Sequence, residues 1–61
     1  MKIEAHRYVV KVKKGRRYGL YTTFPAGRRL AAAGYAKNIA PRFAGVLVFD
    51  RVARVTVWRT K

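Results

Sequence analysis

The chain has no cysteine, serine or glutamine, and only two of its 61 residues are acidic, Glu4 and Asp50. Without cysteine, disulfide bonds and thiolate metal sites are excluded. No apolar run approaches the roughly 18 residues that a membrane-spanning helix needs, and we expect no signal peptide. One histidine and two carboxylates leave almost no candidates for a catalytic or metal-binding cluster. We therefore expect no enzyme activity, no metal, no cofactor and no small-molecule substrate.

Positive charge, by contrast, is in large excess. Lysine and arginine total 15, which gives a formal net charge of +13 at pH 7. Solubility is normally achieved with mixed signs and a net charge of about 2–8, so this excess favours nucleic acid as the partner. Because 51% of the residues are hydrophobic, a disordered basic tail is not expected. We predict a single nucleic-acid-binding domain over residues 1–61.

Hydrophobic periodicity predicts a hairpin in the first part of the chain. A two-residue alternation indicates strands over 3–13 and 18–24, and Gly15 is expected to take a positive φ in the turn between them. Pro25 ends the second strand because proline has no amide hydrogen to donate. The alternation places one set of side chains of the second strand on a common face: Tyr18, Leu20, Thr22 and Phe24.

The middle of the chain has a helical composition. Three consecutive alanines after Leu30 favour a short helix over 26–38, and Pro41 stops it. Gly34 lies in the middle of this segment, and the alternative to a continuous helix is that Gly34 breaks it or acts as its C-cap.

Strand patterns return after Pro41. The apolar run 46–49 predicts a strand buried on both faces, and alternation continues over 52–59. Asp50 and Arg51 would form a tight turn between two strands, or the two would be one long bent strand. In the last strand the predicted faces are Val55 and Val57 on one side, and Arg54, Thr56 and Trp58 on the other.

These elements predict an α+β fold, a small antiparallel sheet in the order β-β-α-β-β with one short helix. An SH3-like small β-barrel is the alternative.

Paired arginines follow glycine twice, at 15–17 and 27–29. Guanidinium groups bind phosphate through a planar fork, and glycine lets the backbone approach closely. The second pair would also lie near the amide groups of a helix N-terminus, which favour anions. The cations expected to contact nucleic acid come from every element: Lys11, Lys13, Lys14, Arg16, Arg17, Arg28, Arg29, Lys37, Arg42, Arg54 and Arg59.

Aromatic side chains are interleaved with these cations. Tyr21 and Trp58 fall on the faces opposite Leu20 and Val57, which makes them candidates for stacking on unpaired bases, with core packing as the alternative. Core packing is expected of the three phenylalanines, Phe24, Phe43 and Phe49.

His6 is the only histidine, and Glu4 lies two residues away on the same predicted strand face. A small basic ribonuclease could use such a pair as a general base with its orienting carboxylate. A surface position on a basic strand is the simpler interpretation.

The Arg-rich, Ser-free composition and the two Gly-Arg-Arg steps resemble those of small accessory ribosomal proteins of thermophilic archaea. The resemblance implies a cytoplasmic, non-enzymatic rRNA-binding protein with ribosomal proteins as neighbours. In size and basicity the chain is also similar to crenarchaeal chromatin proteins of the SH3-like kind, although it lacks their lysine-rich character. Nine arginines against six lysines, spread over both halves of the chain, favour folded RNA. A DNA-binding chromatin protein of the nucleoid, with little sequence specificity, is the alternative.

Overall fold

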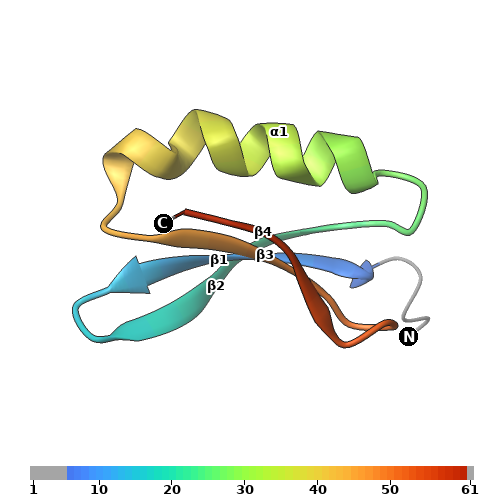
Figure 1. Ribbon diagram of the computed structural model, residues 1–61, viewed down its shortest axis with the longest axis horizontal. Helices are drawn as coiled ribbons and strands as arrows, with labels where there is room; N and C mark the ends of the chain where they lie inside the picture. The colour runs from blue at the N-terminus through green and yellow to red at the C-terminus, as the bar shows by residue number, and fades with distance from the viewer. Residues whose placement is uncertain (1–5, 61) are drawn as a thin grey trace.

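The structure is a computed structural model that describes residues 6–60. Its elements are β1 (Tyr8–Lys14), β2 (Arg17–Phe24), α1 (Arg29–Ile39), the 3-10 helix η2 (Ala40–Arg42), β3 (Val46–Asp50) and β4 (Val55–Arg59). The strands form one antiparallel sheet in the order β2-β1-β3-β4, and α1 lies along one face of it (Figure 1). The predicted α+β fold with β-β-α-β-β order is confirmed. The sheet has β2 and β4 as its two edges, so the alternative of a closed barrel is wrong.

The first hairpin forms where alternation predicts it. Gly15 has a φ of +64°, as expected for its turn. The first strand begins at Tyr8, whereas alternation predicted a start at residue 3. His6 and Arg7 precede it, and residues 3–5 lie outside the described part of the chain.

The core between α1 and the sheet is built from small side chains. Ala32 and Ala36 lie one turn apart on α1 and have no exposed surface, and the largest fully buried side chains are valines. Small residues on the buried stripe allow the helix to lie close to the sheet. The cluster comprises Tyr8, Val10, Val12, Ala32, Ala36, Ile39, Val46 and Val48.

Ala31 and Ala32 should therefore respond differently to replacement by leucine. Ala32 is fully buried, so Ala32→Leu should destabilise the fold by about 1–3 kcal/mol through overpacking. Ala31 is exposed, and Ala31→Leu should change the free energy of unfolding by less than about 0.5 kcal/mol. Chemical denaturation of both variants measures the difference. Equal effects would mean that the buried alanines do not set the distance between helix and sheet.

The helix predicted over 26–38 is present as α1; it runs through Gly34 and ends at Ile39, so the alternative in which Gly34 breaks or caps it is wrong. Apart from the adjoining residues and the backbone of the helix itself, no atom lies within 4 Å of the position that a Cβ would take there. The glycine therefore weakens the helix without relieving any close contact. η2 follows directly, with Pro41 in its first turn, where the missing amide hydrogen is not needed.

The same Gly→Ala change should have opposite effects at Gly34 and Gly15. Gly34→Ala should stabilise the protein by about 0.5–1 kcal/mol, since alanine is the better helix former. Gly15→Ala should destabilise it by about 1–2 kcal/mol, because its φ of +64° disfavours any residue with a Cβ, and Gly15→Val should be worse. Thermal denaturation is the measurement. Full stability of Gly15→Val would show that the turn tolerates another conformation.

A β-bulge in β2 changes the face on which its side chains lie. Val10 pairs with Thr22 but Lys11 pairs with Leu20, so Tyr21 is an additional residue in the ladder. Thr22 therefore lies on the α1 side with Val10, and Leu20 lies on the opposite side with Lys11. The prediction that alternate residues of this strand share one face is wrong for this reason: Tyr18 and Leu20 lie on one side, Thr22 and Phe24 on the other.

A second bulge has the same effect in β4. Val48 pairs with Trp58 and Phe49 pairs with Thr56, so Val57 is the additional residue. Trp58 and Thr56 lie on opposite sides of the sheet, contrary to the prediction that they share a face.

The connection between β3 and β4 is also longer than predicted. It spans residues 51–54, so neither the tight turn at Asp50-Arg51 nor one long bent strand is correct. Arg54 closes it with a φ of +59°, and its amide donates a 2.7 Å hydrogen bond to the carbonyl of Asp50.

Candidate nucleic-acid interface

Asp50 is the acidic residue within residues 6–60, and it is buried. It is only 5% exposed. Arg7 donates two hydrogen bonds to its carboxylate, from Nε to Oδ1 and from Nη2 to Oδ2, each 3.0 Å long. The amides of Val52 and Ala53 donate to Oδ1 at 2.9 and 3.1 Å.

These contacts hold Asp50 in its charged form. The hydrogen bonds from Arg7 lower the pKa of Asp50 to about 2, burial opposes them, and the two amides add to the lowering. The same hydrogen bonds raise the pKa of Arg7. Over residues 6–60, no side-chain carboxylate is therefore left free to offset the cations of the surface.

The sheet face opposite α1 is covered by no element of residues 6–60 (Figure 1). We call it the open face. The cross-strand register aligns Thr23, Val9, Phe49 and Thr56 in one row, and Leu20, Lys11, Leu47 and Arg59 in the next. Lys13 and Tyr18 pair at the end nearest the first hairpin turn.

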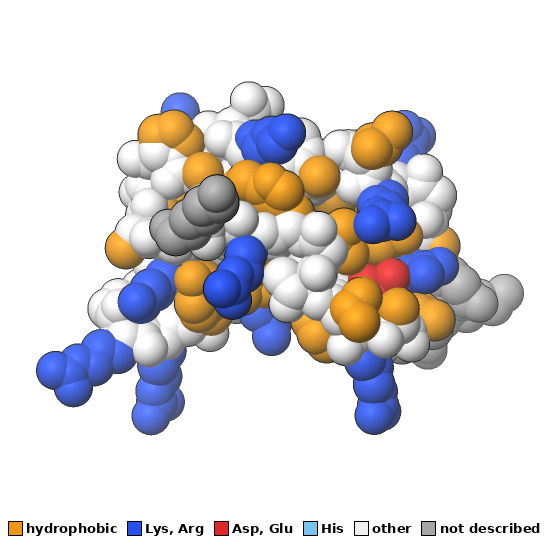
Figure 2. Space-filling model, in the orientation of Figure 1, with side chains coloured by type: hydrophobic (Ala, Val, Ile, Leu, Met, Phe, Trp, Pro, Cys, Tyr) orange, Lys and Arg blue, Asp and Glu red, His pale blue; other side chains and the backbone are white. Residues whose placement is uncertain are grey.

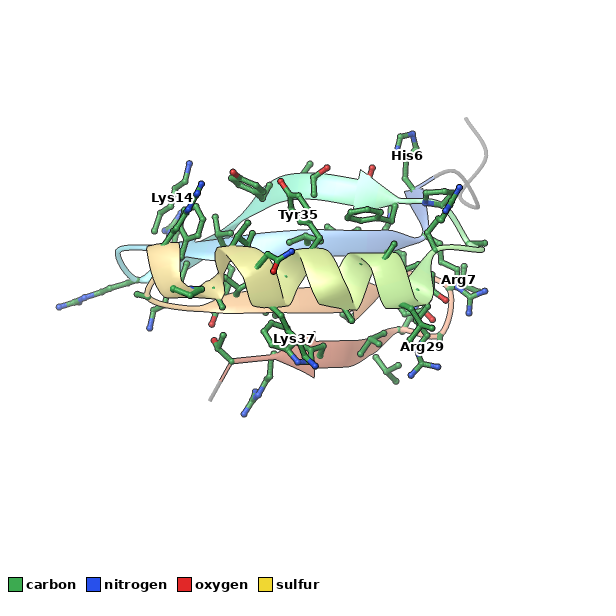
Figure 3. All side chains as sticks on the ribbon, turned by 90° about the horizontal axis from the view of Figure 1, so that it is seen from above. His6, Arg7, Lys14, Arg29, Tyr35 and Lys37 are labelled. Carbon is green, nitrogen blue, oxygen red and sulfur yellow. The ribbon has the colours of Figure 1, made fainter. Side chains whose placement is uncertain are left out.

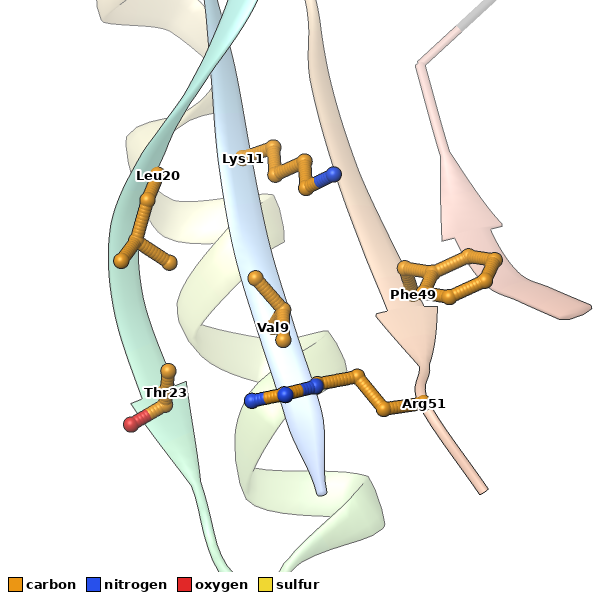
Figure 4. A pocket seen from close by; sticks show the side chains of 6 residues that line it. All are labelled: Val9, Lys11, Leu20, Thr23, Phe49 and Arg51. Atoms are coloured by element: carbon orange, nitrogen blue, oxygen red, sulfur yellow. The ribbon is translucent and has the colours of Figure 1, made fainter. Parts of the chain in front are cut away.

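The open face contains a hollow of about 340 Å³, lined by Val9, Lys11, Leu20, Thr23, Phe49 and Arg51 (Figure 4). Val9 is buried, whereas Leu20 is 66% exposed. The Lys11 ammonium lies 5.8 Å from the centroid of the Phe49 ring, within cation–π range. Arg51 follows β3 and extends across β1 toward Thr23, so its guanidinium lies over the hollow (Figure 4).

The predicted cations do not collect on one surface. Lysine and arginine side chains extend both below the sheet and from the helix side of the molecule (Figure 2). Lys14 lies at one end of the molecule and Arg29 at the other, along a longest extent of 30 Å (Figure 3). By element, the open face carries Lys11, Lys13 and Arg59; the first hairpin turn and its flanks carry Lys14, Arg16 and Arg17; the start of α1 carries Arg28 and Arg29; its end and η2 carry Lys37 and Arg42; and the β3–β4 connection carries Arg54.

The start of α1 has an unusual composition. Arg28 is the N-cap residue, its side chain makes no capping hydrogen bond, and no acidic residue lies in the first turn. Arg28 and Arg29 thus put positive charge at the positive end of the helix dipole, where it destabilises the helix. Phosphate binding by this pair stays a prediction.

Neither aromatic predicted to stack on bases lies on the open face. Tyr21 packs edge-on against Phe43, with ring centroids 5.5 Å apart, and lies 6.1 Å from Tyr35. Burial raises the pKa of Tyr35, and the adjacent Tyr21 adds to the effect. Trp58 is half-buried against the core. Tyr21 nevertheless keeps 43% of its surface exposed, and base stacking by Tyr21 and Trp58 stays a prediction.

Three residues of the open face were missed or misassigned from the sequence. Phe24 and Phe43 pack against the core as expected, but Phe49 lies on the open face. Tyr18, 43% exposed, is the tyrosine on that face. Arg51 was not among the cations predicted to contact nucleic acid. The sequence does not show that a cation after an apolar run will extend back over the sheet.

His6 contacts the edge of the same region. Its Nδ1 lies 2.8 Å from the hydroxyl oxygen of Thr23. Its proposed partner Glu4 lies outside the described residues. In the described range no group of three or more His, Cys, Asp or Glu side chains is placed to hold a metal ion. No helix within residues 6–60 has the length and apolarity needed to cross a membrane.

No protein-family model matches the chain, and no match was found among curated proteins or solved structures.

Proposed function

We propose that this chain is a non-enzymatic RNA-binding protein that neutralises and braces folded rRNA as a component of the ribosome. The observation that carries the proposal is the distribution of charge. Cations extend from both faces and both ends of the molecule, while the carboxylate of Asp50 is held by Arg7. A surface of this kind attracts phosphate from several directions.

Folded RNA fits this distribution better than a straight duplex does. A protein that coats a DNA duplex contacts its phosphates from one side, which leaves cations on the far side without a role. Where several RNA helices converge, phosphates surround a small protein, so cations at the hairpin turn and at α1 have partners at the same time. The excess of arginine over lysine supports this choice, because the guanidinium fork suits irregular phosphate clusters.

Binding then gains most of its free energy from counterion release. Each phosphate neutralised by lysine or arginine releases condensed cations, so the affinity should fall steeply as salt is raised. Bidentate contacts of the arginines add orientation to this unspecific attraction.

Fluorescence anisotropy with three labelled nucleic acids of equal length tests the proposal: a folded RNA junction, an RNA duplex and a DNA duplex. We expect the folded RNA to bind more tightly than the DNA duplex at every salt concentration, with a steep salt dependence. A preference for the DNA duplex, with saturation at a fixed site size, would instead support the chromatin alternative. Absence of binding to all three would refute both.

A further inference from the structure

The open face has a property that phosphate binding alone does not use. Leu20, on the edge strand β2, keeps two thirds of its surface exposed on the sheet face that α1 does not cover, and it borders a hollow floored by Val9. Exposed apolar surface next to cations is typical of a site that binds something both apolar and anionic. A nucleotide has both parts, since its base presents an apolar π-face and its phosphate is charged.

We propose that the hollow of the open face binds one unpaired base of the RNA. The base lies over Val9 between Leu20 and Phe49, and Lys11 and Arg51 contact the adjoining phosphates (Figure 4). This inference rests on the proposed RNA-binding function and names what one part of the surface recognises.

The dimensions and chemistry of the hollow support a base. Its volume of about 340 Å³ lies at the lower end of the range of roughly 300–1,000 Å³ for small-ligand sites. The Arg51 guanidinium is a planar group over that space, and bases stack on such planes as they do on aromatic rings. Thr23 lies at the rim of the hollow, and its hydroxyl contacts Nδ1 of His6 at 2.8 Å.

Charge complementarity selects the occupant. A paired base hides its faces in the helical stack, so only a bulged or single-stranded nucleotide can enter the hollow. A second copy of this chain would bring a further charge of +13 and be repelled. An apolar peptide would leave Lys11 and Arg51 without partners.

The bulge in β2 brings Leu20 and Thr23 to the same face of the sheet, where both line the hollow. Because Tyr21 is an additional residue in the strand, Leu20 pairs with Lys11 across the two strands, and both lie on the open face. In an unbroken ladder, Leu20 and Thr22 would share a face, and Thr23 would not line the same hollow as Leu20.

The test compares two RNA hairpins that differ by one bulged nucleotide, with the full-length protein and three variants. Wild type should bind the bulged hairpin about tenfold more tightly than the fully paired one, as expected for one stacked base. Leu20→Ala and Phe49→Leu should reduce that ratio to about one while leaving the salt dependence unchanged. Leu30→Ala is the matched control, because Leu30 is also exposed but lies on α1, and it should keep the wild-type ratio.

Equal wild-type affinities for the two hairpins would overturn the inference, and so would equal effects of Leu20→Ala and Leu30→Ala. Either result, with a steep salt dependence retained, would leave the proposed RNA binding intact. Failure of wild type to bind either hairpin would reject both. Leu20 is exposed, so its substitution should leave the fold unchanged, and circular dichroism of each variant checks this.

Discussion

Replacing Arg16 and Arg17 together with alanine is expected to weaken RNA binding roughly 25- to 60-fold at about 0.1 M salt. Both residues are exposed at the first hairpin turn, where Gly15 takes a left-handed conformation. Each phosphate contact contributes a salt slope of about 0.7 for single strands and about 0.9 for a duplex. Loss of two contacts should therefore lower the slope of log K against log salt by about 1.4–1.8. Binding titrations over a range of salt concentrations measure both quantities.

The charge-conserving variant Arg16→Lys/Arg17→Lys separates charge from geometry. It should keep the wild-type salt slope, and any loss of affinity then reports the bidentate contacts that lysine cannot make. An unchanged slope in the alanine variant would remove the hairpin turn from the interface.

Within residues 6–60, acid should destabilise the protein through one side chain, the carboxylate of Asp50. Its pKa is about 2 in the folded chain against 3.8 without the fold. A pKa lowered by folding means that the unfolded chain binds the proton more readily. The stabilisation is therefore complete above about pH 4 and is lost progressively as the pH falls toward 2. Urea denaturation at a series of pH values should show this decline.

Asp50→Asn is the matched variant for this experiment. The amide oxygen of asparagine can still accept hydrogen bonds from Val52 and Ala53, but the ion pair with Arg7 is lost. The variant should be less stable than wild type at pH 7 and should lose most of the pH dependence between 4 and 2. A wild-type profile that stays flat down to pH 2, or a variant that keeps the full decline, would contradict the assigned role of Asp50.

The order of elements could be predicted because each local signal is consistent with the final fold. In the sequence, alternating valines indicate β1, Gly15 indicates the first turn, and an alanine-rich segment indicates α1. The bulges could not be predicted, since one inserted residue leaves the composition of a strand unchanged while moving the following side chains to the other face. This is why Leu20 was grouped with Thr22, and why Tyr21, on the face opposite Leu20, was expected on the side away from the core.

The open face shows a second limit of periodicity. A continuous apolar run such as 46–49 predicts burial on both faces, but it cannot show which face a helix will cover. In the structure Val46 and Val48 lie under α1, whereas Phe49 lies on the open face. Arg51 extends over the hollow from the connection after β3, next to Asp50, which binds Arg7. Such a contact over 43 positions along the chain has no signature in local sequence.

Charge and stability are opposed in this chain. The core consists mostly of valine and alanine, α1 begins with two arginines and no side-chain cap, and the net charge of +13 repels itself. A bound polyanion reduces this repulsion and stabilises the folded chain. The charge repulsion that weakens the free protein is thus what the proposed partner would relieve.

The most direct test of RNA binding within the ribosome is sedimentation of a native cell lysate through a sucrose gradient, with and without ribonuclease. Co-migration of the protein with a ribosomal subunit is expected, surviving moderately high salt and lost after ribonuclease treatment. Migration with DNA that ribonuclease leaves unchanged and deoxyribonuclease abolishes would contradict the proposal, as would retention at the top of the gradient under both treatments.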